Sequence, residues 1–225
     1  MKKLIYVLVA GLLLGSCGVM DTRGSLYPKM YEEKPVTLLV MPPINNTTNV
    51  EAKELLYTSI SRPLAEAGYY VISPLVAMDV FKSESAYDSE QFFDGKLDKF
   101  KEFFGVDAVV FSFIESWVKV GVAINTEIRY VIKSAHTGAV LFDRTCDLTL
   151  DLTYRGSYSE QSLLSGLLDV AGTLLDTALT DHIVAARKAN YYIFRDIPRG
   201  KYHPDHMEDF DKSADPQEIS RTVRR

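Results

Sequence analysis

The first seventeen residues indicate where the mature, folded part of this chain begins. Two lysines follow Met1, residues 4–14 form an uninterrupted apolar run, and Gly15 and Ser16 place small residues directly before Cys17. A short positive segment, an apolar run and a small-residue cleavage site are typical of a secretory signal peptide. Because a cysteine stands at the cleavage point, we predict that residues 1–16 are removed and that Cys17 carries lipid as the first residue of the mature chain.

Two other interpretations of this segment fit less well. A transmembrane helix needs around 20 residues to cross the hydrocarbon core, whereas the apolar run would span only about 16 Å. A plain secretory signal would make Cys17 incidental, yet the small residues and the cysteine fall together. Each acyl chain contributes about 0.8 kcal/mol per buried CH₂, so several chains hold a protein on a bilayer far longer than one. We therefore expect a protein tethered to a membrane rather than embedded in it.

The residue after the cysteine indicates which membrane this is. In well-studied Gram-negative bacteria an aspartate at that position retains lipoproteins in the inner membrane, whereas this chain has Gly18. The sequence therefore predicts a lipid-anchored protein of the outer membrane, and we expect it to face the periplasm.

The remaining cysteine limits how the fold can be stabilised. Once Cys17 carries lipid, Cys146 has no second thiol in the chain with which to form a disulfide, so the fold depends on its core. Cys146 lies in the alternating segment 142–150, which favours a buried strand cysteine over a nucleophile. The chain has a net charge of −5 and no basic cluster, which argues against a nucleic-acid partner.

The amino-terminal half has the pattern of a βαβ unit. Residues 36–41 are a short, nearly all-apolar run stopped by two prolines, which predicts a strand buried on both faces. The polar turn 45–49 can cap a following helix over 51–67, which we expect Pro63 to kink and Gly68 to end. A second strand over 69–73 then lies parallel to the first through a right-handed crossover.

The period of the apolar residues changes after Val106. Three β-rich runs, 107–117, 123–133 and 140–152, follow one another, and His136-Thr137-Gly138 reads as a hairpin turn between the last two. Residues 159–188 then carry a long helical stripe wide enough to cover a sheet face. We favour a core helix here over a dimerisation surface.

These elements indicate one α/β domain over residues 35–194. Its fold class is a mixed sheet with an amino-terminal βαβ unit, an antiparallel three-strand meander and a long carboxy-terminal helix. Residues 17–34 are polar and rich in turn formers, so we interpret them as the lipidated cysteine and a linker. Residues 195–225 are densely charged and poor in apolar residues, so we interpret them as a flexible tail.

Four segments resemble a known family. LVMPPIN (39–45), SRPLAEAGYYV (61–71), FGVDA (104–108) and PRGKYHP (198–204) are similar to segments of a family of bacterial lipoproteins of unknown function, typified by a meningococcal genome-derived lipoprotein antigen. The resemblance implies a fold like the amino-terminal domain of TolB and the periplasmic domain of the curli-secretion lipoprotein. Since genes of the family tend to lie beside one for a curli-secretion-like lipoprotein, it also implies an envelope assembly or transport complex. It supplies no catalytic residue.

One group of residues could in principle hold a metal ion. It consists of His203, Asp205, His206, Glu208 and Asp209. Zinc prefers ligands held on rigid elements by further contacts, whereas this group lies in the segment that we interpret as a tail. We therefore predict a solvated tail, without a metal or cofactor.

The sequence also contains little that points to catalysis. His136 in the predicted turn and His182 on the long helix fit surface or packed histidines better than a catalytic base. The chain has no dinucleotide or phosphate-loop glycine pattern, no nucleophile elbow and no zinc-protease motif. Aromatic side chains that could supply an interface are Tyr69, Tyr70, Phe92, Phe93, Trp117, Tyr191 and Tyr192, although most of them should be core.

We therefore expect a non-enzymatic module that binds other envelope proteins, such as a curli-secretion-like lipoprotein, or a second copy of itself. One alternative is an oligomeric export component, in which the hairpin 123–152 would supply strands long enough to cross a membrane. Another is an activator of a cell-wall synthase, although a linker of seventeen residues is short for that role. A hydrolase or metalloenzyme is the remaining alternative.

Overall fold

The computed structural model describes residues 21–84, 87–153 and 170–225, with backbone alone for 170–178. The predicted signal peptide and Cys17 lie outside the described residues. The strands are β1 (Thr37–Val40), β2 (Ile44–Asn45), β3 (Tyr70–Val71), β4 (Ala108–Val120), β5 (Ala123–Ser134), β6 (Val140–Asp151) and β7 (Glu218–Arg224). The helices are α2 (Arg23–Leu26), α3 (Pro28–Glu33), α4 (Val50–Ser59), α5 (Ser61–Glu66), α6 (Pro74–Ser83), α7 (Glu90–Phe93), α8 (Asp98–Phe104) and α9 (Val170–Phe194).

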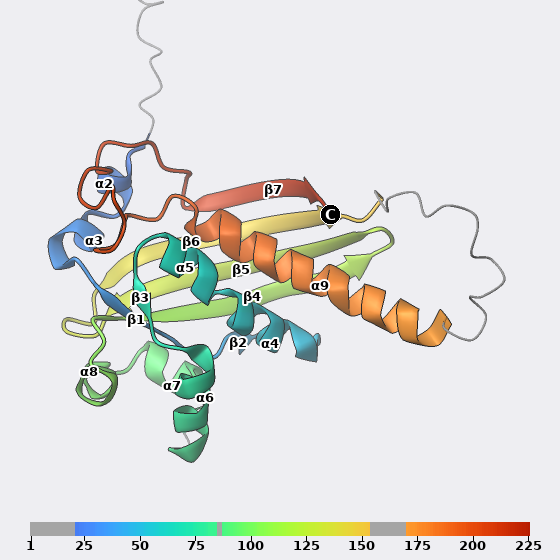
Figure 1. Ribbon diagram of the computed structural model, residues 1–225, viewed down its shortest axis with the longest axis horizontal. Helices are drawn as coiled ribbons and strands as arrows, with labels where there is room; N and C mark the ends of the chain where they lie inside the picture. The colour runs from blue at the N-terminus through green and yellow to red at the C-terminus, as the bar shows by residue number, and fades with distance from the viewer. Residues whose placement is uncertain (1–20, 85–86, 154–169) are drawn as a thin grey trace, which may run out of the picture.

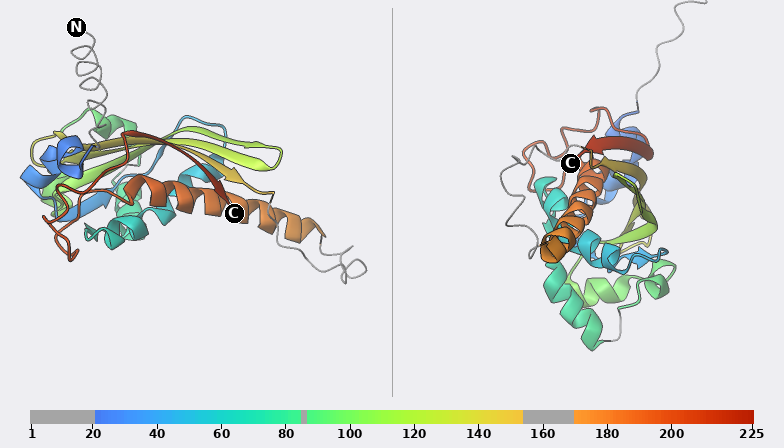
Figure 2. Two further views of the ribbon diagram at one scale, coloured as in Figure 1. Left: turned by 90° about the horizontal axis from the view of Figure 1, so that it is seen from above. Right: turned by 90° about the vertical axis from the view of Figure 1, so that its right-hand side faces the viewer.

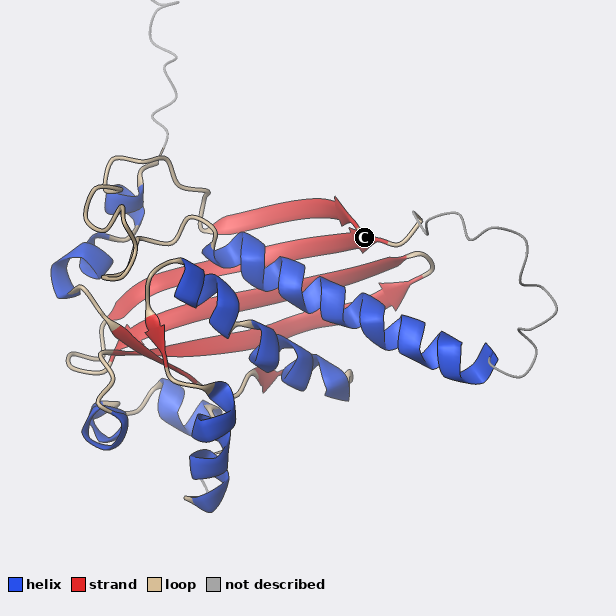
Figure 3. Ribbon diagram, in the orientation of Figure 1, coloured by secondary structure: helices blue, strands red, loops and turns tan. Residues whose placement is uncertain are grey.

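The described strands form one mixed sheet. Its order is β3-β1-β4-β5-β6-β7, with β2 paired to β4 beside that path. The pairs β1–β3, β1–β4, β2–β4 and β6–β7 are parallel, and β4–β5 and β5–β6 are antiparallel. Helices α4, α5 and α9 cross one face of the sheet (Figures 1 and 3). The mixed α/β class that the sequence predicts is therefore confirmed.

Strand β1 is covered on both faces, as its apolar composition predicts. Leu38 and Val40 join the larger core beneath α4 and α9, whereas Leu39 and Met41 join a second core with α6 and α8. Side chains alternate across a strand, so a strand with helices on both sides must be apolar at every position. The views in Figure 2 show helices on either side of this end of the sheet.

The predicted helix over 51–67 is two helices. Asn49 caps α4 through its side chain, which accepts a hydrogen bond from the Ala52 backbone N–H at 3.1 Å. The chain breaks at Ile60, and Pro63 lies in the first turns of α5. Gly68 follows α5 with a φ of 93°, a left-handed conformation that favours glycine.

The predicted meander is confirmed as β4, β5 and β6. Gly138 adopts a φ of 72° in the turn between β5 and β6, where glycine is favoured. The apolar side of that hairpin faces the core beneath α9, which includes Ile128 and Leu148. Cys146 lies on the same side, fully buried, and burial raises the pKa of its thiol to about 12. The prediction of a buried strand cysteine is therefore confirmed.

The linker prediction is wrong from Arg23 onward. Thr22 and Ser25 form a reciprocal capping box at the start of α2, and Pro28 stands in the first turn of α3. Tyr27 and Met30 are buried in the larger core. Polar composition suggested a linker because the apolar residues of this segment are few, but their spacing places them on one packed side.

The prediction of a flexible tail over 195–225 is also wrong. Ile197 is fully buried, and β7 pairs in parallel with β6 from Glu218 to Arg224. Several charges of this segment are paired within the fold. Asp196 pairs with Arg144 of β6, and Asp215 pairs with Arg221. The folded unit therefore extends beyond the predicted boundaries 35 and 194 at both ends.

The long helix predicted over 159–188 is confirmed within the described residues. Residues 159–169 lie outside the described part of the chain, and α9 runs from Val170 past the predicted end to Phe194. Within the described ranges, no helix combines the length and apolar composition that crossing a membrane requires.

Candidate functional site

The carboxy-terminal histidines and acids do not converge on one point. The His206 ring contacts the Arg199 carbonyl at 2.8 Å, and the His203 ring accepts a hydrogen bond from the Asp205 backbone N–H. Asp209 is fully buried and accepts from Arg23 at 2.8 Å. No group of three or more potential metal ligands is found among the described residues. The His203, His206 and Asp209 side chains instead make hydrogen bonds that hold the segment 195–217 in place, which we term the carboxy-terminal loop.

The other two histidines also have structural partners. Nε1 of Trp117 donates to Nδ1 of His182 at 2.8 Å, which joins β4 to α9. Burial, followed by the nearby Lys119 charge, lowers the pKa of His182 below its ordinary value. His136 lies 3.3 Å from Asp107 beside the β5–β6 turn. The prediction that both are surface or packed histidines agrees with these positions.

The surface with the most binding features lies on both sides of α4. On one side is a groove between α4 and α6 with a volume of about 450 Å³. Tyr57 lines this groove, and its hydroxyl donates to the Pro74 carbonyl at 3.0 Å. Burial raises the Tyr57 pKa well above its ordinary value, so the hydroxyl stays a donor. At the rim Leu75 is exposed, and Nζ of Lys53 lies 4.2 Å from the centre of the Tyr87 ring.

On the other side of α4, a groove of about 620 Å³ separates α4 and α5 from α9. Its lining includes Tyr191 and Tyr192, whose ring centres are 5.3 Å apart. Arg187 and Lys188 come from the preceding turn of α9, and Arg62 lies across the groove on α5. Glu66 also lines this groove and pairs with Arg62. The net positive charge of the groove therefore comes from Arg187 and Lys188, in contrast to the net negative charge of the chain.

Buried hydrogen bonds fix the two walls of this groove. Nδ2 of Asn190 on α9 donates to the Leu56 carbonyl at 3.1 Å and to the Ser59 hydroxyl at 2.8 Å, both on α4. The Tyr130 hydroxyl of β5 donates to the other side of the same amide. Asn190 has no exposed surface, so these bonds are shielded from water. The groove is consequently a preformed feature of the fold.

We term the two grooves together the α4 surface. It joins tyrosine, arginine and lysine side chains around partly apolar hollows, and tyrosine and arginine are enriched at protein interfaces. Among the described residues that line it there is neither a histidine nor a cysteine. Such a surface is suited to binding.

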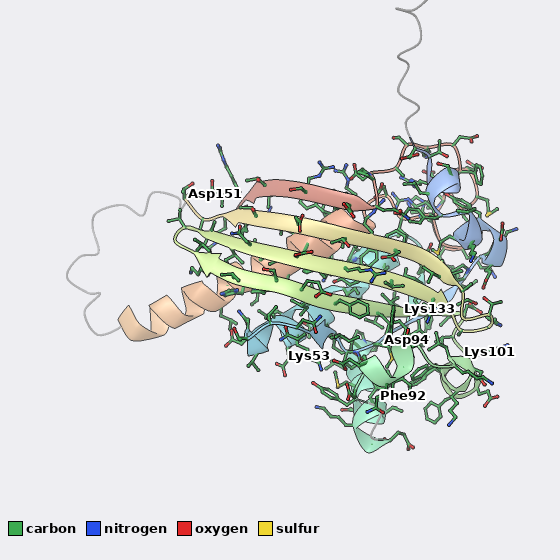
Figure 4. The ribbon with its side chains drawn as sticks, turned by 180° about the vertical axis from the view of Figure 1, so that it is seen from behind. Lys53, Phe92, Asp94, Lys101, Lys133 and Asp151 are labelled. Atoms are coloured by element: carbon green, nitrogen blue, oxygen red, sulfur yellow. The ribbon has the colours of Figure 1, made fainter. Side chains whose placement is uncertain are left out.

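On strands β5–β7, the sheet face that points away from α9 is mainly polar. Figure 4, drawn from behind, shows this face without a covering helix along most of β5 and β6, with α7 near Lys133 and Asp94. Arg129 and Asp143 pair across it at 2.6 Å, and Glu127 is exposed. Its polar side chains fit a solvated sheet face.

Comparison with known proteins decides the family. A family model described as "Putative lipoprotein GNA1162-like" matches residues 26–187, which is well over half of the chain. The chain belongs to this family. The resemblance seen in the four sequence segments is thereby confirmed. Membership in the GNA1162-like family supports a membrane-anchored envelope protein.

A curated relative of the family comes from Neisseria meningitidis serogroup B (strain ATCC BAA-335 / MC58). It is described as "Putative lipoprotein NMB1124/NMB1162", and it is 34% identical over 111 residues, covering 49% of this chain and 52% of the relative. The chain thus spans about half the length of the curated relative that it matches.

Solved structures with a similar fold include the lipoprotein GNA1162 from Neisseria meningitidis. Its TM-score is 0.48 at 23% identity, covering 64% of this chain and 99% of that chain. A variant PelC dodecamer from Paraburkholderia phytofirmans has a TM-score of 0.42 at 12% identity, covering 73% and 90%. The LpoB C-terminal domain from Salmonella enterica has a TM-score of 0.33 at 16% identity, covering 55% and 93%.

Of the aromatic residues that the sequence offers for an interface in this GNA1162-like chain, Tyr191 and Tyr192 line the α4 surface. Of the aromatic residues singled out, Tyr69 and Trp117 are buried, whereas Tyr70 and Tyr191 are about half exposed. Tyr57 and the groove that it lines were missed. The sequence gives little indication of this groove, because Tyr57 directly follows the apolar stripe of α4. Only the packing of α6 shows that its hydroxyl reaches a groove.

Proposed function

We propose that this chain is an outer-membrane lipoprotein, anchored through Cys17, whose domain faces the periplasm as a non-enzymatic interaction module. Its partners are other envelope proteins of an assembly, secretion or transport complex. The single observation that carries the proposal is the α4 surface, a preformed pair of grooves lined by tyrosine and cationic side chains. The positive groove between α4 and α9 favours a partner segment that carries acidic side chains.

The short connection to Cys17 supports a partner close to the anchoring membrane. The described part of the fold includes Asp21, whose carbonyl accepts the Ala214 N–H, so three residues, 18–20, lie between it and the predicted lipid at Cys17. An activator that reaches across the periplasm would need a long linker. The synthase-activator alternative is therefore disfavoured relative to a complex at the same membrane.

The test is site-specific photocrosslinking in intact cells. A photoreactive phenylalanine analogue replaces Tyr191 in one variant and Leu75 in another, since both side chains are exposed beside the grooves. The matched control carries it at Glu127, which is exposed on the opposite sheet face. We expect the two groove variants to yield a discrete adduct, absent from the control. Adducts that form equally at all three positions, or at none, would contradict the proposal.

A further inference from the structure

The place where the chain leaves the fold toward Cys17 is enclosed by the carboxy-terminal loop. The Ala214 backbone N–H donates to the Asp21 carbonyl at 2.9 Å, and the Arg23 N–H donates to the Lys212 carbonyl at 3.0 Å. The Gly24 N–H donates to the Phe210 carbonyl at 2.9 Å. Figure 1 shows α2 surrounded by this loop at one end of the molecule, well away from α6.

This end of the molecule exposes apolar side chains to solvent. Phe210 is 45% exposed and Met207 is 41% exposed. One side of the Phe210 ring lies against Gly24, where a methyl group would meet the ring at 2.4 Å, and the ring also contacts Tyr31 edge-on at 5.0 Å. The other side of the ring remains free. Phe210 is therefore held in a fixed position against Gly24, which is three residues after Asp21.

Met207 is held in an unusual conformation. Its φ is 66°, in the left-handed region where glycine and asparagine are preferred and a long side chain adds strain. The surrounding turns maintain this conformation, with the His206 N–H donating to His203 and the Glu208 N–H to Asp205. Strained residues persist where the structure over-determines them and are concentrated at functional sites. Here the strain presents a methionine to the outside of the loop.

The length of the intervening chain limits where this loop can lie relative to a lipid anchor. Three residues, 18–20, lie between Cys17 and Asp21, so even a fully extended chain places the two at most about 14 Å apart. The lipid chains of Cys17 would end in the bilayer, and the polar headgroup zone on each side of the hydrocarbon core is several ångströms thick. A domain on so short a connection must rest against that zone.

We propose that Met207 and Phe210 insert into the interfacial zone of the phospholipid bilayer and fix the orientation of the domain on its membrane. This inference rests on the proposed lipid anchor at Cys17. Exposed apolar side chains, phenylalanine among them, suit such a contact, because segments that lie on a membrane bury their apolar side chains at the boundary between headgroups and acyl chains. Two half-exposed side chains do not hold a domain on a membrane alone, so the anchor supplies the affinity and the loop supplies the orientation.

The charges around the loop indicate that the contact is apolar rather than electrostatic. Asp209 is neutralised by the buried Arg23, and Asp205 pairs with Lys212 at 2.7 Å. The remaining exposed charges include Lys201, Glu208 and Asp211, which are of both signs. We therefore expect the orientation to be insensitive to salt, since salt screens interactions between charges and not the burial of apolar side chains.

The experiment uses the full, lipidated protein in vesicles of phosphatidylethanolamine and phosphatidylglycerol. A polarity-sensitive fluorophore is attached to a cysteine introduced by Glu208→Cys, next to Met207. The matched control is Glu84→Cys at the end of α6, which is equally an exposed glutamate but lies far from α2. Labelling is selective because Cys146 is fully buried and its thiol has a raised pKa.

We expect the emission at position 208 to move to shorter wavelength and to be largely quenched by spin-labelled lipids, with neither change at position 84. Adding Met207→Asn, which suits the positive φ, should return the emission at 208 toward its value in water. If the protein floats with vesicles but position 208 behaves like position 84, the docking inference fails and the anchor stands. If the lipidated protein does not float with vesicles at all, the anchor and the docking inference both fail.

Discussion

Arg23 at the start of α2 and Asp209 in the carboxy-terminal loop form a buried ion pair, with 2.8 Å between Nη1 and Oδ2. The Asp209 carboxylate also accepts the Arg199 backbone N–H at 2.9 Å. The pair joins two segments at opposite ends of the sequence. From composition alone, both segments would be assigned to irregular regions. It holds the loop on the side of the fold from which the chain leaves toward Cys17.

Removing the carboxylate from this pair should destabilise the protein strongly. Asp209→Ala leaves the Arg23 guanidinium buried without its partner, and breaking a buried pair in this way costs about 3–5 kcal/mol. Urea denaturation of the parent and of Asp209→Ala measures the difference in their free energies of unfolding. Arg62→Ala serves as the control, because Arg62 pairs with Glu66 at the surface and should contribute little. Equal midpoints for the two variants would contradict the role of the buried pair.

Gly200 should tolerate no side chain, since a methyl group there would meet the Gly68 carbonyl oxygen at 2.4 Å. The two backbones also bond directly at this point, with the Tyr202 N–H donating to the Gly68 carbonyl at 3.0 Å. Gly200→Ala is expected to cost about 1–3 kcal/mol through overpacking. Gly95→Ala is the matched control, because its new methyl group would meet its nearest neighbour at 3.4 Å. Thermal unfolding of both variants tests this, and an unchanged melting temperature for Gly200→Ala would be the contrary result.

The single tryptophan should report the protonation of His182. Trp117 donates to the neutral ring, and burial holds the His182 pKa below its ordinary value of 6.5. As the pH falls, the unfolded chain takes up this proton before the folded one does, so the group's contribution to stability is lost below about pH 6.5. Tryptophan fluorescence should change with a midpoint below 6.5, and His182→Gln should remove that transition. A transition that persists in the variant would show that another group causes it.

Alkaline pH should lower the free energy of unfolding, because the buried Tyr27 hydroxyl and Cys146 thiol resist ionisation. Burial raises the Tyr27 pKa from 10.0 to about 12, and that of Cys146 from 9.0 to about 12. Both groups ionise first in the unfolded chain, so the stability they provide is present below pH 9 and declines as the pH rises toward 12. Urea midpoints measured across this range should fall, and less steeply in Tyr27→Phe. Identical slopes for Tyr27→Phe and the parent would contradict the assignment to Tyr27.

The regular elements of this fold could be predicted because each follows a local rule. The nearly all-apolar run of β1, the alternation of β5 and the Asn49 cap each depend on neighbours within a few residues. The α2–α3 segment and the carboxy-terminal loop could not be predicted from composition, because their polar groups are satisfied by partners far away in the sequence.

One residue in the sequence did indicate the fold of the carboxy-terminal loop. Arg144 alternates with Phe142 and Cys146 on the buried side of β6, where a charge requires a buried partner. Its guanidinium bonds Asp196, the Ile193 carbonyl and the Tyr27 hydroxyl. A buried arginine in a core strand therefore predicts that a carboxylate elsewhere in the chain is ordered.

The exposure of the aromatic side chains was predictable only in part, for a different reason. Tyr69 and Tyr70 are adjacent and chemically identical, yet Tyr69 is buried and bonds the Pro198 carbonyl, whereas Tyr70 is exposed. Alternation along a strand distinguishes the two sides, but which side faces solvent depends on how the carboxy-terminal loop packs. Aromatic composition alone cannot separate core from interface.

The lipid anchor is the claim on which the proposed location, the function and the docking of the loop all depend. Its most direct test is incorporation of radiolabelled palmitate into the full-length chain and into Cys17→Ser, followed by fractionation of the envelope. We predict that the parent takes up label and sediments with outer membranes, and that Cys17→Ser takes up none and is released. A Cys17→Ser chain that is processed and sediments like the parent would contradict the account.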